Sequence, residues 1–251
     1  MAGRVAQATF ANETALQRYT DLLARLEEMG GEWEQRFDIL AARQRIYNLS
    51  GQQEQRRADI EQMLTLAEAH DDVGRRADAL NLLADFHFTT GRYVEAEATA
   101  REALEIERGL EDVAGQAAAL NTLGVLNYVR GDYDEARAPL LRAVELYQQV
   151  DDLEGDAWST MYLGMIDFMT GRYSDAARRH QEALYMARER KDWFQEGIHL
   201  TNAARVAAGM GAEVTVLDRS LPRLRYLDDV FGGVFRTRYA STGSTAELVA
   251  E

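Results

Sequence analysis

The chain has 251 residues, of which 46% are hydrophobic and only 2 are proline, a composition typical of a helical globular protein. It contains no cysteine, which excludes disulfides and thiolate metal sites. The formal net charge of -14 gives an acidic surface that repels phosphate backbones and anionic lipid, so we expect neither nucleic acid nor a membrane as partner. The first residues lack the apolar run of a signal peptide, and we expect a cytoplasmic protein.

The first predicted element is a helix over residues 11–29. Its apolar side chains recur at helical spacing, and two glycines end the run: Leu16, Tyr19, Leu22, Leu23 and Leu26, then Gly30 and Gly31. We interpret residues 1–32 as an N-terminal capping helix.

A pattern of glycine, tyrosine and alanine then recurs every 40 residues. The glycines are Gly91, Gly131 and Gly171, a tyrosine follows each two residues later, and alanines follow at Ala96, Ala136 and Ala176 and again at Ala103, Ala143 and Ala183. A fixed period of this length predicts a stack of one helix hairpin, whose copies bury their apolar faces on each other.

Each residue type in the pattern suits one place in a hairpin. Glycine adopts the left-handed backbone conformation at the end of the first helix without steric cost. We expect Asp134 and Ser174 to cap the second helix, and the alanines to allow a close helix crossing. Aspartates at the same period should cap the next first helix: Asp72, Asp112, Asp152 and Asp192.

These residues resemble the tetratricopeptide repeat, clearly over residues 77–196 and in frame from about 37 to 211. The resemblance implies an all-α solenoid of antiparallel hairpins, which we assign to residues 33–196. The first repeat is degenerate, because Gln44 and Arg56 stand where Gly124 and Ala136 stand later.

In that family the first helices line a concave groove, and the resemblance implies a non-catalytic scaffold that binds a peptide or protein partner there. The array is also expected to be a regulatory module of a larger signalling protein. The alternative at each position is a residue that packs between helices. The positions carried over are Asn81, Asp85, Phe88, Asn121, Val125, Tyr128, Trp158, Met161, Met165 and Phe168.

The repeat pattern stops after Gly211, where an alternating strand-like stretch ends in Asp218. Residues 201–248 resemble part of the NAD-binding domain of alanine dehydrogenase, through Asn202–Arg205, Gly209–Ala212 and Val214–Arg219 among others. The resemblance implies a partial Rossmann segment within residues 197–251, with Asp218 as its ribose-binding acid. Only Gly197 remains of the glycine fingerprint.

The second functional hypothesis is therefore an inactive, NAD-binding dehydrogenase fragment or a chimera. No residue inherits the family's catalytic lysine or histidine, and we expect no enzyme activity and no cofactor. The four histidines are not spaced as metal ligands on one helix face, so we expect no metal. We expect the segment after Gly211 to be weakly ordered, because one or two strands without the rest of their sheet are marginally stable.

Overall fold

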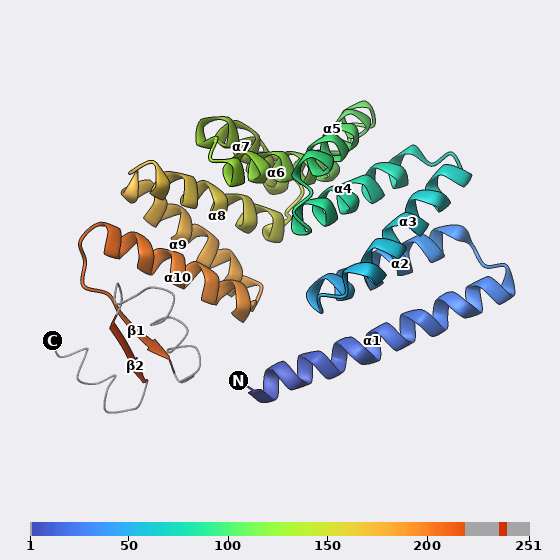
Figure 1. The fold of residues 1–251 in the computed structure, drawn as a ribbon, viewed down its shortest axis with the longest axis horizontal. Coiled ribbons are helices and arrows are strands. Elements are labelled where there is room, and N and C mark those ends of the chain that lie inside the picture. Colours follow the sequence, from blue (N-terminus) through green and yellow to red (C-terminus); the bar gives the residue numbers. More distant parts are fainter. Residues whose placement is uncertain (1, 219–235, 240–251) are drawn as a thin grey trace. The chain divides into compact units, whose positions relative to one another are not determined.

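A computed structural model describes residues 2–218 and 236–239 (Figure 1). Within those residues the chain forms ten helices and two short strands. The first helices of the hairpins are α2 (Trp33–Leu49), α4 (Val73–Thr89), α6 (Val113–Arg130), α8 (Leu153–Met169) and α10 (Trp193–Gly209). The second helices are α3 (Gln53–Ala69), α5 (Tyr93–Gly109), α7 (Tyr133–Gln149) and α9 (Tyr173–Glu189). A longer helix, α1 (Ala2–Met29), precedes them.

The starting residues confirm the predicted period. First helices begin at residues 33, 73, 113, 153 and 193, and second helices at 53, 93, 133 and 173. The all-α array of hairpins with a 40-residue repeat is therefore confirmed. The predicted boundaries of three parts at residues 32 and 196 stay a prediction.

By its internal contacts the chain forms two compact units, Met1–Leu126 and Asn127–Glu251, with the division inside α6. We call them unit 1 and unit 2 and describe each by itself. Unit 1 contains α1 to α5 and most of α6. Unit 2 contains the end of α6 and α7 to α10, with strands β1 (Thr215–Asp218) and β2 (Arg236–Tyr239). No helix among the described residues has the length and apolarity needed to span a bilayer.

The glycines that end the first helices have the predicted left-handed backbone, with φ of 78° at Gly91, 88° at Gly131 and 76° at Gly171. The aspartate caps are also confirmed. The carboxylate of Asp72 accepts a hydrogen bond from the Arg75 amide at 2.9 Å, and Asp112, Asp152 and Asp192 accept from the amide three residues on at 3.0 to 3.2 Å.

The prediction that Asp134 and Ser174 cap the second helices is wrong. Those helices begin one residue earlier, at Tyr133 and Tyr173, so both predicted caps lie inside the first helical turn. The Tyr133 amide donates to the Gly131 carbonyl at 3.0 Å, and the chain enters the helix directly after the glycine turn. The residues before these helices make no side-chain capping bond.

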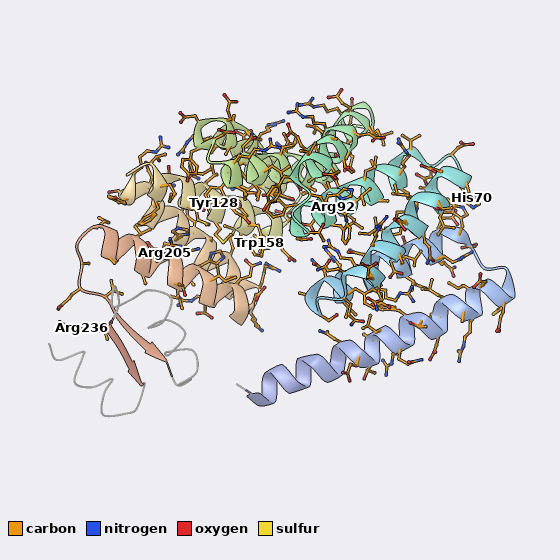
Figure 2. All side chains as sticks on the ribbon, in the orientation of Figure 1. His70, Arg92, Tyr128, Trp158, Arg205 and Arg236 are labelled. Atoms are coloured by element: carbon orange, nitrogen blue, oxygen red, sulfur yellow. The ribbon has the colours of Figure 1, made fainter. Side chains whose placement is uncertain are left out.

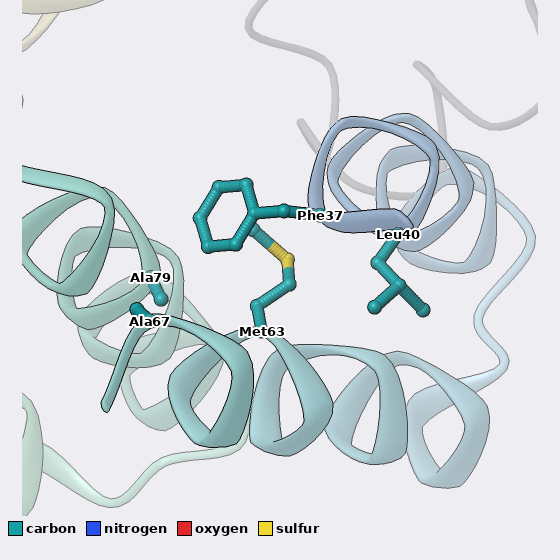
Figure 3. Close-up of a cluster of buried hydrophobic side chains, with 5 residues drawn as sticks. All are labelled: Phe37, Leu40, Met63, Ala67 and Ala79. Carbon is teal, nitrogen blue, oxygen red and sulfur yellow. The ribbon is translucent and has the colours of Figure 1, made fainter. Parts of the chain in front are cut away.

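The core of unit 1 begins where α2 packs on α3 and α4. Figure 3 shows Phe37 and Leu40 of α2 above Met63 and Ala67 of α3, with Ala79 of α4 beside them. The predicted alanine stripe is buried in both units, at Ala96 and Ala103 and at Ala136, Ala143, Ala176 and Ala183. Small residues let the helix backbones approach closely at these crossings.

In the degenerate first repeat, a polar contact replaces the crossing of small residues. Arg56 Nε donates to Gln44 Oε1 at 3.3 Å, and both side chains are buried.

The predicted strand ending in Asp218 is confirmed as β1, which pairs in parallel with β2 so that Thr215 faces Arg236 and Asp218 faces Tyr239. Most of the segment expected to be weakly ordered lies outside the described residues.

Candidate partner-binding face

The ten predicted groove residues divide evenly between the units. Five lie in unit 1, on α4 and the first part of α6, and five lie in unit 2, on the end of α6 and on α8. All of them come from first helices of hairpins. Their surroundings differ, however, and the difference decides which of them lie at an accessible surface.

In unit 1 the polar groove residues bind other parts of the same unit. Asn81 Nδ2 donates to Glu107 Oε1 at 2.5 Å and to the Gly115 carbonyl at 3.2 Å. Asp85 Oδ2 accepts from Arg56 at 2.5 Å. Both side chains therefore contribute first to the stability of unit 1.

The remaining predicted residues of unit 1 offer little open surface. Phe88 packs on Tyr93, with ring centroids 5.8 Å apart, and Asn121 is half-buried. Val125 is only 3% exposed and belongs to the core. Sequence position placed Val125 on the groove, but its side chain points into the packing of α6.

Unit 2 has an aromatic surface instead. Trp158 and Tyr162 lie one turn apart on α8, with ring centroids 6.5 Å apart and ring planes inclined by 28°. Tyr128, at the end of α6, meets Tyr162 edge-on at 5.5 Å. All three are half-buried, and Figure 2 labels Tyr128 and Trp158. We call Tyr128, Trp158 and Tyr162 the aromatic wall.

A small cleft of about 20 Å³ extends this surface toward α10. Tyr128, Met165 and Phe168, three of the predicted residues, line it together. Three residues of α10, Asn202, Arg205 and Val206, line it as well. The Arg205 guanidinium lies 5.7 Å above the ring of Phe168, and Figure 2 labels Arg205.

Met161 does not join this surface, because its side chain is only 4% exposed and packs in the core. Tyr162 and Arg205 were not among the predicted groove residues. Tyr162 follows Trp158 by four residues, so helical spacing alone could have placed it on the same face. Arg205 lies within the repeat frame, 40 residues after Met165, but groove positions were assigned only to the three regular repeats.

Burial changes the protonation of several groups near these surfaces. Burial raises the pKa of Tyr128, with Tyr133 adding to the effect, so its phenol stays neutral and able to donate a hydrogen bond. In unit 1, burial and the nearby Asp112 and Asp78 raise the pKa of Glu107 to about 8. A protonated Glu107 fits a position that is fully buried beside Asn81.

Two histidines of unit 2 are buried in the packing of α9 and α10. Burial lowers the pKa of His180 to about 4, with His199 and Arg205 contributing, and burial lowers that of His199 to about 4 as well. Both nitrogens of His199 and Nδ1 of His180 are buried, and none of the described residues forms a hydrogen bond with them. Both rings are therefore neutral at physiological pH.

The dehydrogenase-like residues lie in a different setting from a phosphate-binding loop. Gly197 is inside α10, and the backbone there continues as a regular helix from Trp193 to Gly209. Asp218 is the last residue of β1. Helical backbone amides at Gly197 are engaged within the helix rather than turned toward a ligand.

The stacked hairpins and the small-residue crossings define a helical repeat protein. Residues 75–149 and 115–189 match the family model of the tetratricopeptide repeat, and residues 196–251 match that of the alanine dehydrogenase/PNT C-terminal domain. Residues 75–189 are thus tetratricopeptide repeats, followed by a segment related to alanine dehydrogenase.

The dehydrogenase relatives match only the end of the chain. Alanine dehydrogenase of Halomonas elongata is 49% identical over 55 residues, which are 22% of this chain and 15% of that protein. The Mycolicibacterium smegmatis enzyme is 56% identical over 48 residues, 19% of this chain and 13% of that protein. The chain therefore spans about 15% of the length of these relatives.

The solved structures resemble the whole helical array. A Rap protein complexed with Competence and Sporulation Factor has a TM-score of 0.67 and 20% identity, covering 91% of this chain and 62% of that chain. BtubC from P. vanneervenii has a TM-score of 0.64 and 16% identity, covering 92% and 96%. A signal transduction ATPase with a tetratricopeptide repeat sensor from Pyrococcus horikoshii has a TM-score of 0.61 and 21% identity. The match covers 77% of this chain and 28% of that chain. At these identities the likeness shows the fold.

Proposed function

We propose that this protein is a non-catalytic scaffold that binds a peptide or protein segment on the aromatic wall of unit 2. The observation that carries the proposal is the contact of Trp158 and Tyr128 with Tyr162 on first helices of the array. Large rigid rings supply contact area at a low entropic cost, which is why aromatic residues are common at interface centres.

The small cleft beside the wall adds apolar contact surface next to the three rings. Met165 and Phe168 line it, and the flexible thioether of methionine adapts to irregular shapes. Arg205, at its edge, supplies hydrogen-bond donors for the partner's backbone or carboxylates. Similar folds include a Rap protein complexed with Competence and Sporulation Factor and an ATPase with a repeat sensor, which supports a partner-sensing, regulatory role.

The proposal is tested with peptides selected by display on the whole protein. We expect Trp158→Ala and Phe168→Ala to weaken the selected peptides about tenfold or more, since each removes a central ring. The matched control is Phe88→Ala in unit 1, because Phe88 packs on Tyr93 as Phe168 packs on Tyr173. Equal binding to the Trp158→Ala variant, with its folding intact by circular dichroism, would refute the proposal.

The second candidate function, NAD binding by a dehydrogenase fragment, is favoured by the match over residues 196–251 and by the parallel pairing of β1 with β2. The continuous helix through Gly197 weighs against it. A titration followed by NADH fluorescence separates the two. Saturable binding that Asp218→Ala abolishes would favour the dehydrogenase fragment, and a flat titration would favour the scaffold.

A further inference from the structure

Unit 2 also contains a cavity of about 480 Å³ between α7 and α9, and no residue of the aromatic wall lines it. Asp156 and Thr160 of α8 form its floor, and the walls come from the two second helices: Val144 and Gln148 on α7, and Glu182, Tyr185 and Met186 on α9. Its volume lies within the range of small-molecule sites, about 300 to 1,000 Å³.

The cavity lies on another face of α8 from the aromatic wall. Trp158 and Tyr162 are four residues apart and share one face of the helix. Asp156 and Thr160 are also four apart, and each lies two residues, or about 200°, from its aromatic neighbour. The two surfaces are therefore separate sites on one helix.

The floor of the cavity holds a buried charge without a counter-ion. Asp156 is only 5% exposed. Its carboxylate accepts from Gln148 Nε2 at 3.0 Å and from Thr160 Oγ1 at 2.9 Å, both neutral donors. Among the residues that the structure describes, no lysine, arginine or histidine forms an ion pair with it. Burying a carboxylate this way is costly unless a cation compensates it.

The equivalent place in unit 1, 80 residues earlier, shows what is missing. There Arg76 takes the position of Asp156, and its guanidinium pairs with Glu68 of α3 at 3.9 Å and with Glu102 of α5. In unit 2 these two acids correspond to Gln148 and Glu182. Unit 2 thus keeps the acid on α9, Glu182, but has the acid Asp156 at the position of the arginine.

The same comparison explains why there is a cavity at all. In unit 1 the position of Thr160 is occupied by Leu80, which is buried against Leu104 and packed by Leu64. Threonine and Val144 replace Leu80 and Leu64 in unit 2, and both have smaller side chains. The volume that leucine fills in unit 1 is open in unit 2.

We propose that this cavity binds an alkylguanidinium group, with the cation beside Asp156 and its methylene chain along Val144, Tyr185 and Met186. A guanidinium matches a carboxylate with two parallel donors, and its chain covers apolar surface. Two arginines also border the cavity, and both pair with acids other than Asp156. Arg178 pairs with Glu182 at 2.9 Å, and Arg179 pairs at 2.9 Å with Asp167, which Arg137 and Arg172 also contact.

The test uses the whole protein and two ligands that differ in charge, L-argininamide and its neutral urea analogue L-citrullinamide. We expect saturable binding of argininamide by calorimetry, with shifts of the Met186 methyl resonance, and binding of citrullinamide about tenfold weaker or less. Asp156→Asn should weaken argininamide binding about tenfold or more. Thr160→Leu, which restores the residue of unit 1, should abolish binding while the thermal midpoint stays equal or rises.

The control is Glu189→Gln, which removes an exposed negative charge at the end of α9 and should leave binding unchanged. A capped Gly-Arg-Gly peptide identifies the source of the group. Tighter binding of the peptide than of argininamide indicates a partner's arginine side chain, and equal or weaker binding indicates a free small molecule.

Absence of saturable argininamide binding, or an Asp156→Asn variant that binds as well as the natural protein, would overturn the proposal. Asp156 would then be stabilised by Gln148, Thr160 and the N-terminal end of α8 alone. The outcome is independent of the aromatic wall, because Trp158→Ala should leave argininamide binding intact.

Discussion

Tyr147 occupies the space where any side chain on Gly155 would begin, since a Cβ on Gly155 would lie 2.2 Å from Cε1 of Tyr147. The same relationship occurs one repeat earlier, where a Cβ on Gly115 would lie 2.6 Å from Cδ of Glu107. In the other two repeats the second helix carries Ala67 or Ala187 at this position, and the next first helix carries a large residue. A large residue on one helix is thus matched by glycine on the next.

This match predicts that Gly155→Ala lowers the free energy of unfolding by about 1 to 3 kcal/mol, because the Tyr147 ring or the backbone of α8 must move. The control is Gly197→Ala in α10, where, apart from the backbone of that helix, none of the described residues has a heavy atom within 4 Å of the added Cβ. There alanine should stabilise by up to about 1 kcal/mol through its better helix propensity. Urea denaturation followed by circular dichroism measures both changes.

Copying the last repeat into this place tests the same relationship. Tyr147→Ala with Gly155→Gln reproduces Ala187 and Gln195. We expect the double variant to be more stable than the sum of the single changes by about 1 to 2 kcal/mol. Simple additivity would show that Tyr147 and Gly155 do not constrain each other.

The repeat could be predicted from the sequence because its signals are local. The turn glycines and the capping aspartates act within one helix end, so Gly131 and Asp152 were placed correctly. Groove residues depend on which way a side chain faces among three helices. For this reason the groove residues predicted from repeat position alone included Met161, which is buried, and omitted Tyr162, which belongs to the aromatic wall. The cavity beside Asp156 required a comparison of packing between units, which no single residue reveals.

Glu107 should make unit 1 less stable as pH rises. Its pKa is about 8 in the folded protein and about 4.5 in the unfolded chain, so the folded state holds a proton that the unfolded state releases. The stabilising contribution is complete below pH 4.5 and is lost as pH rises toward 8. We expect a loss of about 2 to 4 kcal/mol across this window, measured by hydrogen exchange in peptides of α4 and α5.

Glu107→Gln separates this effect from the other acids near it. The amide stays neutral and keeps an acceptor for Asn81, whereas Asp78 and Asp112, which also act on Glu107, are unchanged. The variant should show a flat profile between pH 5 and 8. A wild-type profile that is already flat would show that Glu107 is ionised in the folded protein.

His180 and His199 should give unit 2 the opposite dependence on pH. Their pKa values are about 4 in the folded protein and about 6.5 in the unfolded chain, so the unfolded state binds protons that the folded state excludes. Stability is complete above pH 6.5 and falls as pH drops toward 4, by about 2 to 3 kcal/mol per histidine.

The charged groups around the two rings do not reverse this sign. Arg205 acts with burial on His180, Asp167 opposes it, and Asp192 opposes burial at His199. His180→Leu introduces the residue found at the equivalent buried position, Leu140, and should reduce the loss of protection in α9 between pH 6.5 and 5. An unchanged acid profile in this variant would assign the loss to other groups.

Arg56 should be the most sensitive residue of the first repeat. It is 1% exposed, and its guanidinium donates to Gln44, Asn48 and Thr89 besides its ion pair with Asp85. Arg56→Ala leaves a cavity and several unsatisfied acceptors, and we expect it to lower the free energy of unfolding by about 3 to 5 kcal/mol.

The pair Arg56→Ala with Gln44→Gly restores the small residues of the regular repeats at this crossing. If the polar contact only substitutes for a close crossing of helices, this double variant should recover at least about 1 kcal/mol relative to Arg56→Ala, as read from urea denaturation. A double variant less stable than the single one would show that the separation of α2 and α3 is fixed by other contacts.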